Sequence, residues 1–228
     1  IVALFLQNLI FAQIQVGSTI LQEREVVGGL DVPWEIKWGP DSNETNEFLW
    51  VTERSGIVSK INVETGEKNI ILDIQSSVTT ESESGMLGME FHPDFEANNI
   101  VFIVYTYYQG FNIRERLSAF TYNPEVNVLE NEQILINGIT GNSTHNGSRL
   151  HALDDYTLLM TTGDAQNQSD SQDTQILTGK ILRIDISGEN FGGVPFDNPF
   201  SDSYVWSWGH RNAQGLELAP NGIVYSSE

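Results

Sequence analysis

Short apolar segments separated by polar turns dominate the hydrophobic pattern of this chain. The segments are rich in β-branched and aromatic residues, a composition typical of β-strands. Glycine, asparagine, aspartate and proline separate them, and helix signals are weak throughout. The pattern predicts an all-β fold, with strands at residues 48–52, 57–61, 100–107, 116–120, 157–161, 204–206 and 223–225.

A turn followed by a short apolar strand recurs along the chain at intervals of about 50 to 70 residues. This spacing suits one four-stranded propeller blade per repeat. An open antiparallel sandwich would explain the strands but not the repeat. We therefore expect a β-propeller with about four blades in these 228 residues, and expect the chain to lack its C-terminal blades. The four turns are Pro40-Asp41, Pro93-Asp94, Asp154-Asp155 and Pro220-Asn221-Gly222.

The chain begins with an apolar run from Ile1 to Ala12, which has the length of a signal-peptide core and is too short to span a membrane. Residues 1–20 are interpreted as a partial signal peptide, and residues 21–228 as the N-terminal part of one β-propeller domain. This interpretation predicts an extracytoplasmic protein, secreted or periplasmic. The alternative is an apolar strand that closes part of the fold.

The charge balance is strongly acidic, with 31 Asp and Glu against 11 Lys and Arg and a formal net charge of −20. Nucleic acids and anionic membrane surfaces require basic patches, so we expect neither as a partner, and no membrane insertion of the mature domain. An anionic ligand would need a local cluster of positive charge, which draws attention to Arg149, Arg183 and Arg211. The chain has no cysteine, which excludes disulfides, thiolate metal sites and a cysteine nucleophile.

Three polar segments carry the candidate chemistry, and the loops of a propeller would gather them around one central channel. His145 follows a polar loop and is suited to accept a proton near neutral pH, and Asp164 would orient it. Arg211 offers a two-pronged donor for carboxylates, and Asn212 and Gln214 supply both donors and acceptors. The alternatives are that His145 has only a structural role, and that the segment with Arg211, Asn212 and Gln214 is a polar loop that hydrogen-bonds to its own backbone.

The other histidines do not show metal-ligand spacing, and no segment resembles a calcium-binding loop. His92 is interpreted as a turn residue among packed aromatics and His210 as a local stacking or capping group, while His151 has no evident partner. Phosphate-binding loops, a serine nucleophile elbow and the strand–glycine–helix pattern of nicotinamide binding are all missing from the sequence.

From about Val26 to Glu228 the chain resembles the soluble pyrroloquinoline-quinone (PQQ) sugar dehydrogenases of the glucose/sorbosone dehydrogenase family. Several motifs in the family's order make the resemblance specific, whereas any one alone would be weak. The resemblance implies a six-bladed β-propeller. The motifs are residues 30–34, 51–56, 85–89, 92–95, 145–150 (His-Asn-Gly-Ser-Arg-Leu), 162–164 (Thr-Gly-Asp), 179–184, 197–200 and 209–216 (Gly-His-Arg-Asn-Ala-Gln-Gly-Leu).

Residue roles follow from the resemblance by motif. His145 would be the general base that takes a sugar hydroxyl proton, and Asp164 would orient it. Arg211, Asn212 and Gln214 would hold PQQ, which would accept a hydride as an aldose is oxidised to its lactone. The family also implies calcium, whose ligands are expected beyond residue 228. The implied partners are a sugar substrate and an electron acceptor that the motifs do not identify.

Glu83 departs from the family, which often has glutamine at this position. A carboxylate there would face an anionic cofactor, so Glu83 is not counted among the PQQ contacts. Two other functions remain open at this point. One is a non-enzymatic propeller that binds a protein or glycan, because fold alone does not establish chemistry. The other is a calcium-dependent lactonase that works without PQQ.

Overall fold

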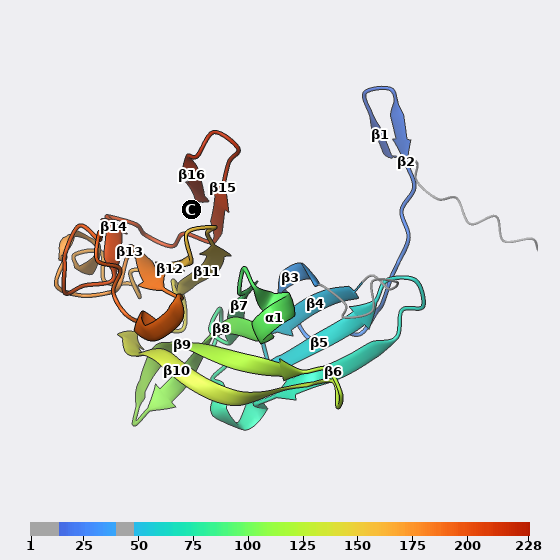
Figure 1. Ribbon diagram of the computed structural model, residues 1–228, viewed down its shortest axis with the longest axis horizontal. Helices are drawn as coiled ribbons and strands as arrows, with labels where there is room; N and C mark the ends of the chain where they lie inside the picture. Colours follow the sequence, from blue (N-terminus) through green and yellow to red (C-terminus); the bar gives the residue numbers. More distant parts are fainter. Residues whose placement is uncertain (1–13, 40–47) are drawn as a thin grey trace, which may run out of the picture.

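The computed structural model describes residues 14–39 and 48–228, and β-structure dominates them (Figure 1). They form three four-stranded antiparallel sheets, one two-stranded sheet and a separate N-terminal hairpin. Helical structure within these ranges is limited to the four-residue helix α1 (Phe95–Asn98) and three short 3-10 turns, η1 (Gln75–Ser77), η2 (Asp170–Gln172) and η3 (Gly188–Asn190). The predicted all-β class is therefore confirmed.

The sheets follow the chain in order, and each is a simple antiparallel meander. Blade 1 comprises β3 (Pro33–Gly39), β4 (Phe48–Glu53), β5 (Ile57–Asn62) and β6 (Lys68–Asp73). Blade 2 comprises β7 (Met86–Phe91), β8 (Ile100–Gln109), β9 (Asn112–Asn123) and β10 (Val128–Thr140). Blade 3 comprises β11 (Gly147–Ala152), β12 (Thr157–Thr162), β13 (Lys180–Asp185) and β14 (Val205–Trp208). Blade 4 contributes β15 (Gly215–Leu218) and β16 (Val224–Ser227).

The first strands of successive blades contact one another, β3 with β7, β7 with β11 and β11 with β15. Figure 1 shows the sheets as an arc with these four strands on its inner side. This radial order is that of a β-propeller and not of a sandwich. The prediction of a partial propeller is confirmed, with three complete blades and two strands of a fourth among the described residues.

The sequence repeat marks the same position in every blade. The strands that follow the repeated turns are β4, β8, β12 and β16, which are the second strands of their sheets. The first of these turns, Pro40-Asp41, lies outside the described residues. The repeated turn in the sequence therefore corresponds to the connection between the first and second strands of each blade.

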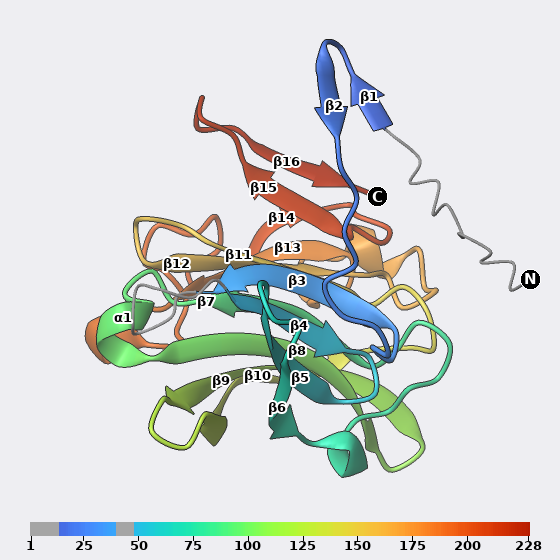
Figure 2. The ribbon, with the colours of Figure 1, turned by 90° about the vertical axis from the view of Figure 1, so that its right-hand side faces the viewer.

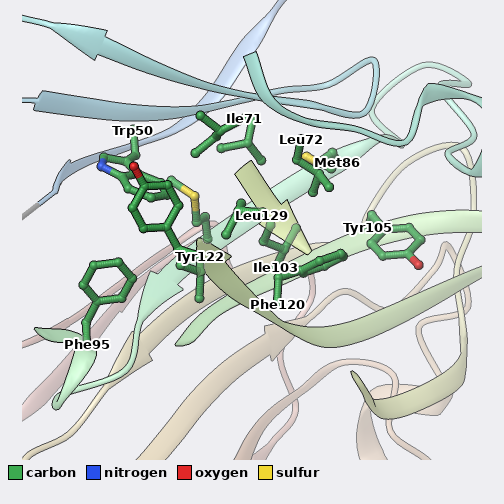
Figure 3. Close-up of a cluster of buried hydrophobic side chains, with 13 residues drawn as sticks. Trp50, Ile71, Leu72, Met86, Phe95, Ile103, Tyr105, Phe120, Tyr122 and Leu129 are labelled. Carbon is green, nitrogen blue, oxygen red and sulfur yellow. The ribbon is translucent and has the colours of Figure 1, made fainter. Parts of the chain in front are cut away.

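Buried apolar clusters join neighbouring blades. Between blades 1 and 2, the fully buried Trp50 meets the rings of Phe91, Phe95 and Tyr122 edge-on, with ring centroids 4.9–5.9 Å apart. Figure 3 shows Trp50, Phe95 and Tyr122 in this cluster. A second cluster, which includes Phe102, joins blades 2 and 3. Edge-on aromatic packing adds to the free energy gained from burial. The loops at the strand ends are thus carried by a firmly packed frame.

The N-terminal hairpin, β1 (Ile14–Val16) with β2 (Thr19–Leu21), stands apart from the blades in Figure 1. Of the residues interpreted as a partial signal peptide, 1–13 lie outside the described residues and 14–20 fall in this hairpin. Across residues 14–39 and 48–228, no helix has the length and hydrophobicity needed to cross a membrane.

Candidate active site

Three loops converge at one end of blades 3 and 4. They precede β11 (residues 141–146), follow β12 (residues 163–179) and precede β15 (residues 209–214). Because β11 and β12 are antiparallel and pair Gly147 with Thr162, the start of one strand lies beside the end of the other. This topology brings together the three segments that the sequence singled out.

His145 and Asp164 form a hydrogen-bonded dyad, with 2.8 Å between His145 Nδ1 and Asp164 Oδ1. The Asp164 side chain is 2% exposed and the imidazole 17%. Because a carboxylate only accepts hydrogen bonds, the Nδ1 atom carries the proton and Nε2 presents a lone pair. Nε2 has no hydrogen-bond partner in the part of the chain that the structure describes. This geometry leaves the Nε2 lone pair available to accept a proton.

Gly163 allows the close backbone approach that forms the dyad. A Cβ atom at this position would lie 1.8 Å from the carbonyl oxygen of His145. His145 itself has a left-handed backbone (φ +60°), a conformation uncommon for residues other than glycine. Its carbonyl oxygen accepts the N–H of Ala165 at 3.1 Å, and the Asp164 carboxylate accepts the N–H of Gln166 at 2.8 Å. The Thr-Gly-Asp motif thus has a steric basis.

A buried lysine organises the long loop after β12. The Lys180 ammonium is fully buried and donates to the carbonyl oxygens of Asp170, Ser171 and Thr178 at 2.8, 3.2 and 2.5 Å. Burial lowers the pKa of Lys180, although Asp173 and Asp170 oppose this shift. Three carbonyl oxygens around one ammonium group fix the fold of the loop that contains Asp164.

Glu83 holds the backbone of the proposed base. Its carboxylate accepts the N–H of His145 at 3.1 Å, and its own N–H donates to the carbonyl of Ser143 at 2.8 Å. Two hydrogen bonds therefore join the loop that enters blade 2 to the loop that enters blade 3. The sequence marked Glu83 as a departure from the family, but gave no signal of this contact.

Arg211 and Asn212 are joined to the dyad through hydrogen bonds. The Arg211 carbonyl accepts the N–H of Asp164 at 2.8 Å, and Asn212 Oδ1 accepts the N–H of Gly147 at 3.0 Å. The backbone N–H of Gln214 bonds to the carbonyl of Ser227 at 2.9 Å. The side-chain oxygen of Asn212 is thus committed to the start of β11, and its amide nitrogen is the group available to a ligand.

A cavity of about 350 Å³ adjoins this loop. Arg211, Asn212 and Gln214 line it, together with Ser227 and Glu228, whereas His145 and Asp164 do not. The five predicted site residues therefore lie in one region, divided between a proton-accepting dyad and a neighbouring cavity.

Glu228 braces the loop that carries Arg211. Its carboxylate contacts His210 Nδ1 at 2.6 Å and accepts the N–H of Arg211 at 2.9 Å, and His210 Nε2 lies 2.9 Å from Ser207 Oγ. Burial alone would raise the pKa of Glu228, but the hydrogen bonds from Arg211 and His210 hold it below its usual value. The local role expected for His210 is thus a hydrogen-bonded link between Ser207 and Glu228.

Two of the three arginines considered for an anionic ligand are already paired. Arg149 forms an ion pair with Glu35 and lies over the Trp34 ring at 4.4 Å. Arg183 bridges Asp155 and Asp197 at 2.9 and 2.7 Å, on the outer part of blade 3. No carboxylate of residues 14–39 and 48–228 pairs with the Arg211 guanidinium. Arg211 is therefore the cation available at this cavity.

The cavity suits a planar ligand that carries carboxylates, because a guanidinium and two amide side chains face it. Both Glu228 oxygens are occupied by His210 and Arg211, which reduces their repulsion of an anion. A metal ion is not accommodated in the same way. Within the described ranges, no group of three or more His, Asp or Glu side chains is placed to hold one.

The fold and the site define a β-propeller that carries a histidine–carboxylate dyad beside a polar cavity lined by an arginine. The chain belongs to the Glucose / Sorbosone dehydrogenase family, whose model matches residues 30–228. The family prediction is therefore confirmed.

Individual relatives agree with this assignment. The chain is 28% identical to quinoprotein glucose dehydrogenase B of Acinetobacter calcoaceticus over 92% of its own length and 48% of that protein. It is 25% identical to the aldose sugar dehydrogenase YliI of Escherichia coli K12, over 90% of this chain and 54% of the relative.

A solved structure supports the fold as well. The PQQ-bound aldose sugar dehydrogenase of Streptomyces coelicolor superposes with a TM-score of 0.80 at 29% identity, over 90% of this chain and 58% of that one. The chain thus spans about half the length of the curated relatives it matches.

Proposed function

We propose that the protein to which this chain belongs oxidises aldose sugars to lactones with PQQ as the oxidant. The observation that carries the proposal is the dyad of His145 and Asp164, which is joined to the loop of Arg211 by the hydrogen bond from the Asp164 N–H to the Arg211 carbonyl. Membership of the glucose/sorbosone dehydrogenase family supports the same reaction class. An extracytoplasmic location belongs to the same proposal.

The reaction removes one proton and one hydride from the anomeric centre of the sugar. His145 Nε2 takes the proton of the anomeric hydroxyl, while the Asp164 carboxylate holds Nδ1–H and stabilises the imidazolium that forms. The C–H bond breaks at the same carbon, and its electron pair leaves with the hydride, so that the C–O single bond becomes the lactone carbonyl. Bound PQQ would supply the hydride acceptor.

Arg211 and the free amides of Asn212 and Gln214 would hold the cofactor in the 350 Å³ cavity by its carboxylates and quinone oxygens. For calcium, which the resemblance also implies, residues 14–39 and 48–228 contain no cluster of three or more His, Asp or Glu side chains, and its ligands are expected beyond residue 228.

The test is dye reduction by the full-length protein, loaded with PQQ and calcium and supplied with a panel of aldoses. His145→Ala should lower kcat by about 10²–10⁴-fold, the usual contribution of a general base, and leave PQQ binding intact. Asp164→Asn should also lower kcat, because it weakens control of the imidazole tautomer. His151→Ala, which removes a histidine from the strand β11 that follows the His145 loop, is the matched control and should keep wild-type turnover.

Dye reduction no faster than the blank without PQQ would remove the dehydrogenase proposal. PQQ-independent binding of a protein or glycan would then favour a non-enzymatic propeller, and lactone hydrolysis without PQQ would favour a lactonase. Full activity of His145→Ala would keep the reaction class and remove His145 from the role of base.

A further inference from the structure

A second cavity, of about 610 Å³, lies between blades 2 and 3. It is bordered by the β7–β8 turn, the β11–β12 turn and the segment that follows β13. Strand β11 begins beside the dyad and ends next to the turn that carries Tyr156, so the cavity is one strand length from His145, roughly 20 Å. Figure 2 shows α1, in the β7–β8 connection, and the C-terminal residue at opposite ends of the strands.

The cavity is built on a rigid floor. The buried His92 accepts hydrogen bonds at Nδ1 from the Asp94 N–H at 3.0 Å and the Asn98 amide at 2.8 Å. Its Nε2–H donates across the blade boundary to the carbonyl of Ile186 at 3.0 Å. Both ring nitrogens are thus hydrogen-bonded, Nδ1 within blade 2 and Nε2 to blade 3, and the cavity floor is preformed.

Tyr156 forms a fixed aromatic wall. Its N–H donates to the carbonyl of Leu153 at 3.1 Å, and its carbonyl accepts the N–H of Ile186 at 2.9 Å. The phenol hydroxyl reaches Asp94 Oδ1 at 3.2 Å, and the ring lies 5.9 Å from that of His92. The side chain nevertheless remains 37% exposed. Its position is therefore held from three sides, and part of its ring is available to a ligand.

The groups left free at this cavity have a distinct chemistry. Gln133 is exposed, and its amide has no partner among the residues that the structure describes. Asp94 has one carboxylate oxygen unused, and Phe191 adds a second aromatic side chain to Tyr156. Aromatic side chains together with planar polar groups complement a compact ligand that has apolar C–H faces and hydroxyl groups at its edges.

Charge narrows the choice of ligand. The carboxylate of Asp94 and the net charge of −20 disfavour an anion. No other acidic side chain lines the cavity, so a divalent cation would lack the oxygen ligands it requires. We propose that this cavity binds a neutral polyhydroxylated ligand, a small saccharide, at a site separate from the catalytic one.

Methyl β-D-glucopyranoside is the probe of choice. It has no free anomeric hydroxyl, so it cannot undergo the proposed oxidation, and its binding is independent of that function. We expect saturable binding to the full-length protein in saturation-transfer NMR titrations. Tyr156→Asn, which removes the ring and suits the left-handed backbone at this residue (φ +59°), should weaken binding about tenfold or more. Gln133→Ala, at an exposed position, should also weaken it.

His145→Ala is the control and should bind the probe like the wild type. Absence of saturable binding would overturn the proposal, as would equal affinities for the wild type and both cavity variants. Loss of binding in His145→Ala alone would place the saccharide at the dyad and overturn it as well. Since dye reduction is measured separately, failure of this proposal and failure of the proposed function are distinguishable.

Discussion

At the scale of single residues, the site depends on atoms that are not themselves reactive. Gly163 makes room for the His145 carbonyl, Glu83 accepts the His145 N–H, and Asp164 fixes the imidazole tautomer. Nearby, Glu115 lies completely buried beneath the start of β11, where its carboxyl group accepts the Ser148 hydroxyl at 2.7 Å. These positions allow tests of how the frame supports the chemistry.

Gly163→Ala should both destabilise the protein and impair the dyad. The new Cβ would meet the carbonyl oxygen of His145 at 1.8 Å, and this backbone atom cannot rotate away. We expect a loss of about 1–3 kcal/mol in the free energy of unfolding, measured by urea denaturation. Gly138→Ala is the control, because its Cβ would meet no atom within 4 Å and only its left-handed backbone (φ +78°) opposes the change. An equal loss in both variants would contradict the steric argument.

Glu115 should make stability fall as the pH rises. Burial raises the pKa of Glu115 from 4.5 to about 8, although the Ser148 hydroxyl opposes this shift. Between these two values the folded state holds a proton that the unfolded state has released, so the stabilisation is complete below pH 4.5 and is lost as the pH passes 8. Glu115→Gln should remove this part of the pH dependence from urea unfolding measured between pH 5 and about 9. If the free energy of unfolding changed with pH in the same way in the wild type and in Glu115→Gln, the role assigned to Glu115 would be contradicted.

At the scale of elements, one contact recurs in all four blades. A residue at or near the C-terminal end of the second strand accepts a hydrogen bond from the segment that enters the first strand. The acceptors are Glu53 from Asp31 N–H at 2.7 Å, Thr106 from Gly85 N–H at 2.8 Å, Asp164 from His145 Nδ1–H at 2.8 Å, and Glu228 from Arg211 N–H at 2.9 Å. The dyad is thus the blade 3 version of a structural contact, with an imidazole as donor in place of a backbone N–H.

The two hydrogen bonds of Glu83, which join the entry loops of blades 2 and 3, are a further feature at the scale of elements. Glu83→Ala should expose the His145 amide, so that its hydrogen exchange accelerates about tenfold or more, because its acceptor is lost. Glu83→Gln keeps an acceptor oxygen and should retain much of the protection. The kcat of the proposed sugar oxidation should follow the same order, wild type and Glu83→Gln above Glu83→Ala. Unchanged exchange in Glu83→Ala would show that the Glu83 carboxylate does not position His145.

The sequence predicted some strands of each blade better than others. The second strands stood out because they are apolar and follow turn residues, as in β8 and β12. Strand β7 contains Gly88, and a glycine weakens the strand signal of the sequence. The neighbouring blade nevertheless requires this glycine, because a Cβ atom there would lie 1.9 Å from the Ser148 carbonyl oxygen. Strand β10 is an edge strand with several exposed polar residues, and its pairing to β9 rather than its composition defines it.

At the scale of the whole molecule, the acidic surface opposes the compact state. With a net charge of −20, mutual repulsion between carboxylates is greater in the folded protein than in the expanded chain. Raising NaCl from about 10 to 150 mM shortens the screening length from about 30 to 8 Å. The thermal midpoint should therefore rise by a few degrees, as measured by circular dichroism. KCl at the same ionic strength should act equally, and a constant or falling midpoint would contradict the argument.

The convergence of the site is also a property of the whole molecule. The motifs supplied His145, Asp164, Arg211, Asn212 and Gln214, and the propeller brings them to one region. Residue types alone did not reveal that Arg149 and Arg183 are paired, because their partners Glu35 and Asp197 lie far away or across a loop. Nor did they reveal the cavity beside Tyr156, which exists only where two blades meet.

The recurring strand-end contact has a consequence for protein engineering. In blade 1, Asp31 lies two positions before β3, as His145 lies two positions before β11, and the buried carboxylate of Glu53 already faces its backbone. Blade 1 therefore repeats the arrangement that His145 and Asp164 form in blade 3, although Ser59 and Lys68 also donate to the Glu53 carboxylate. Asp31→His is the single exchange by which a designer would begin to install another proton-transfer pair in the same ring of blades.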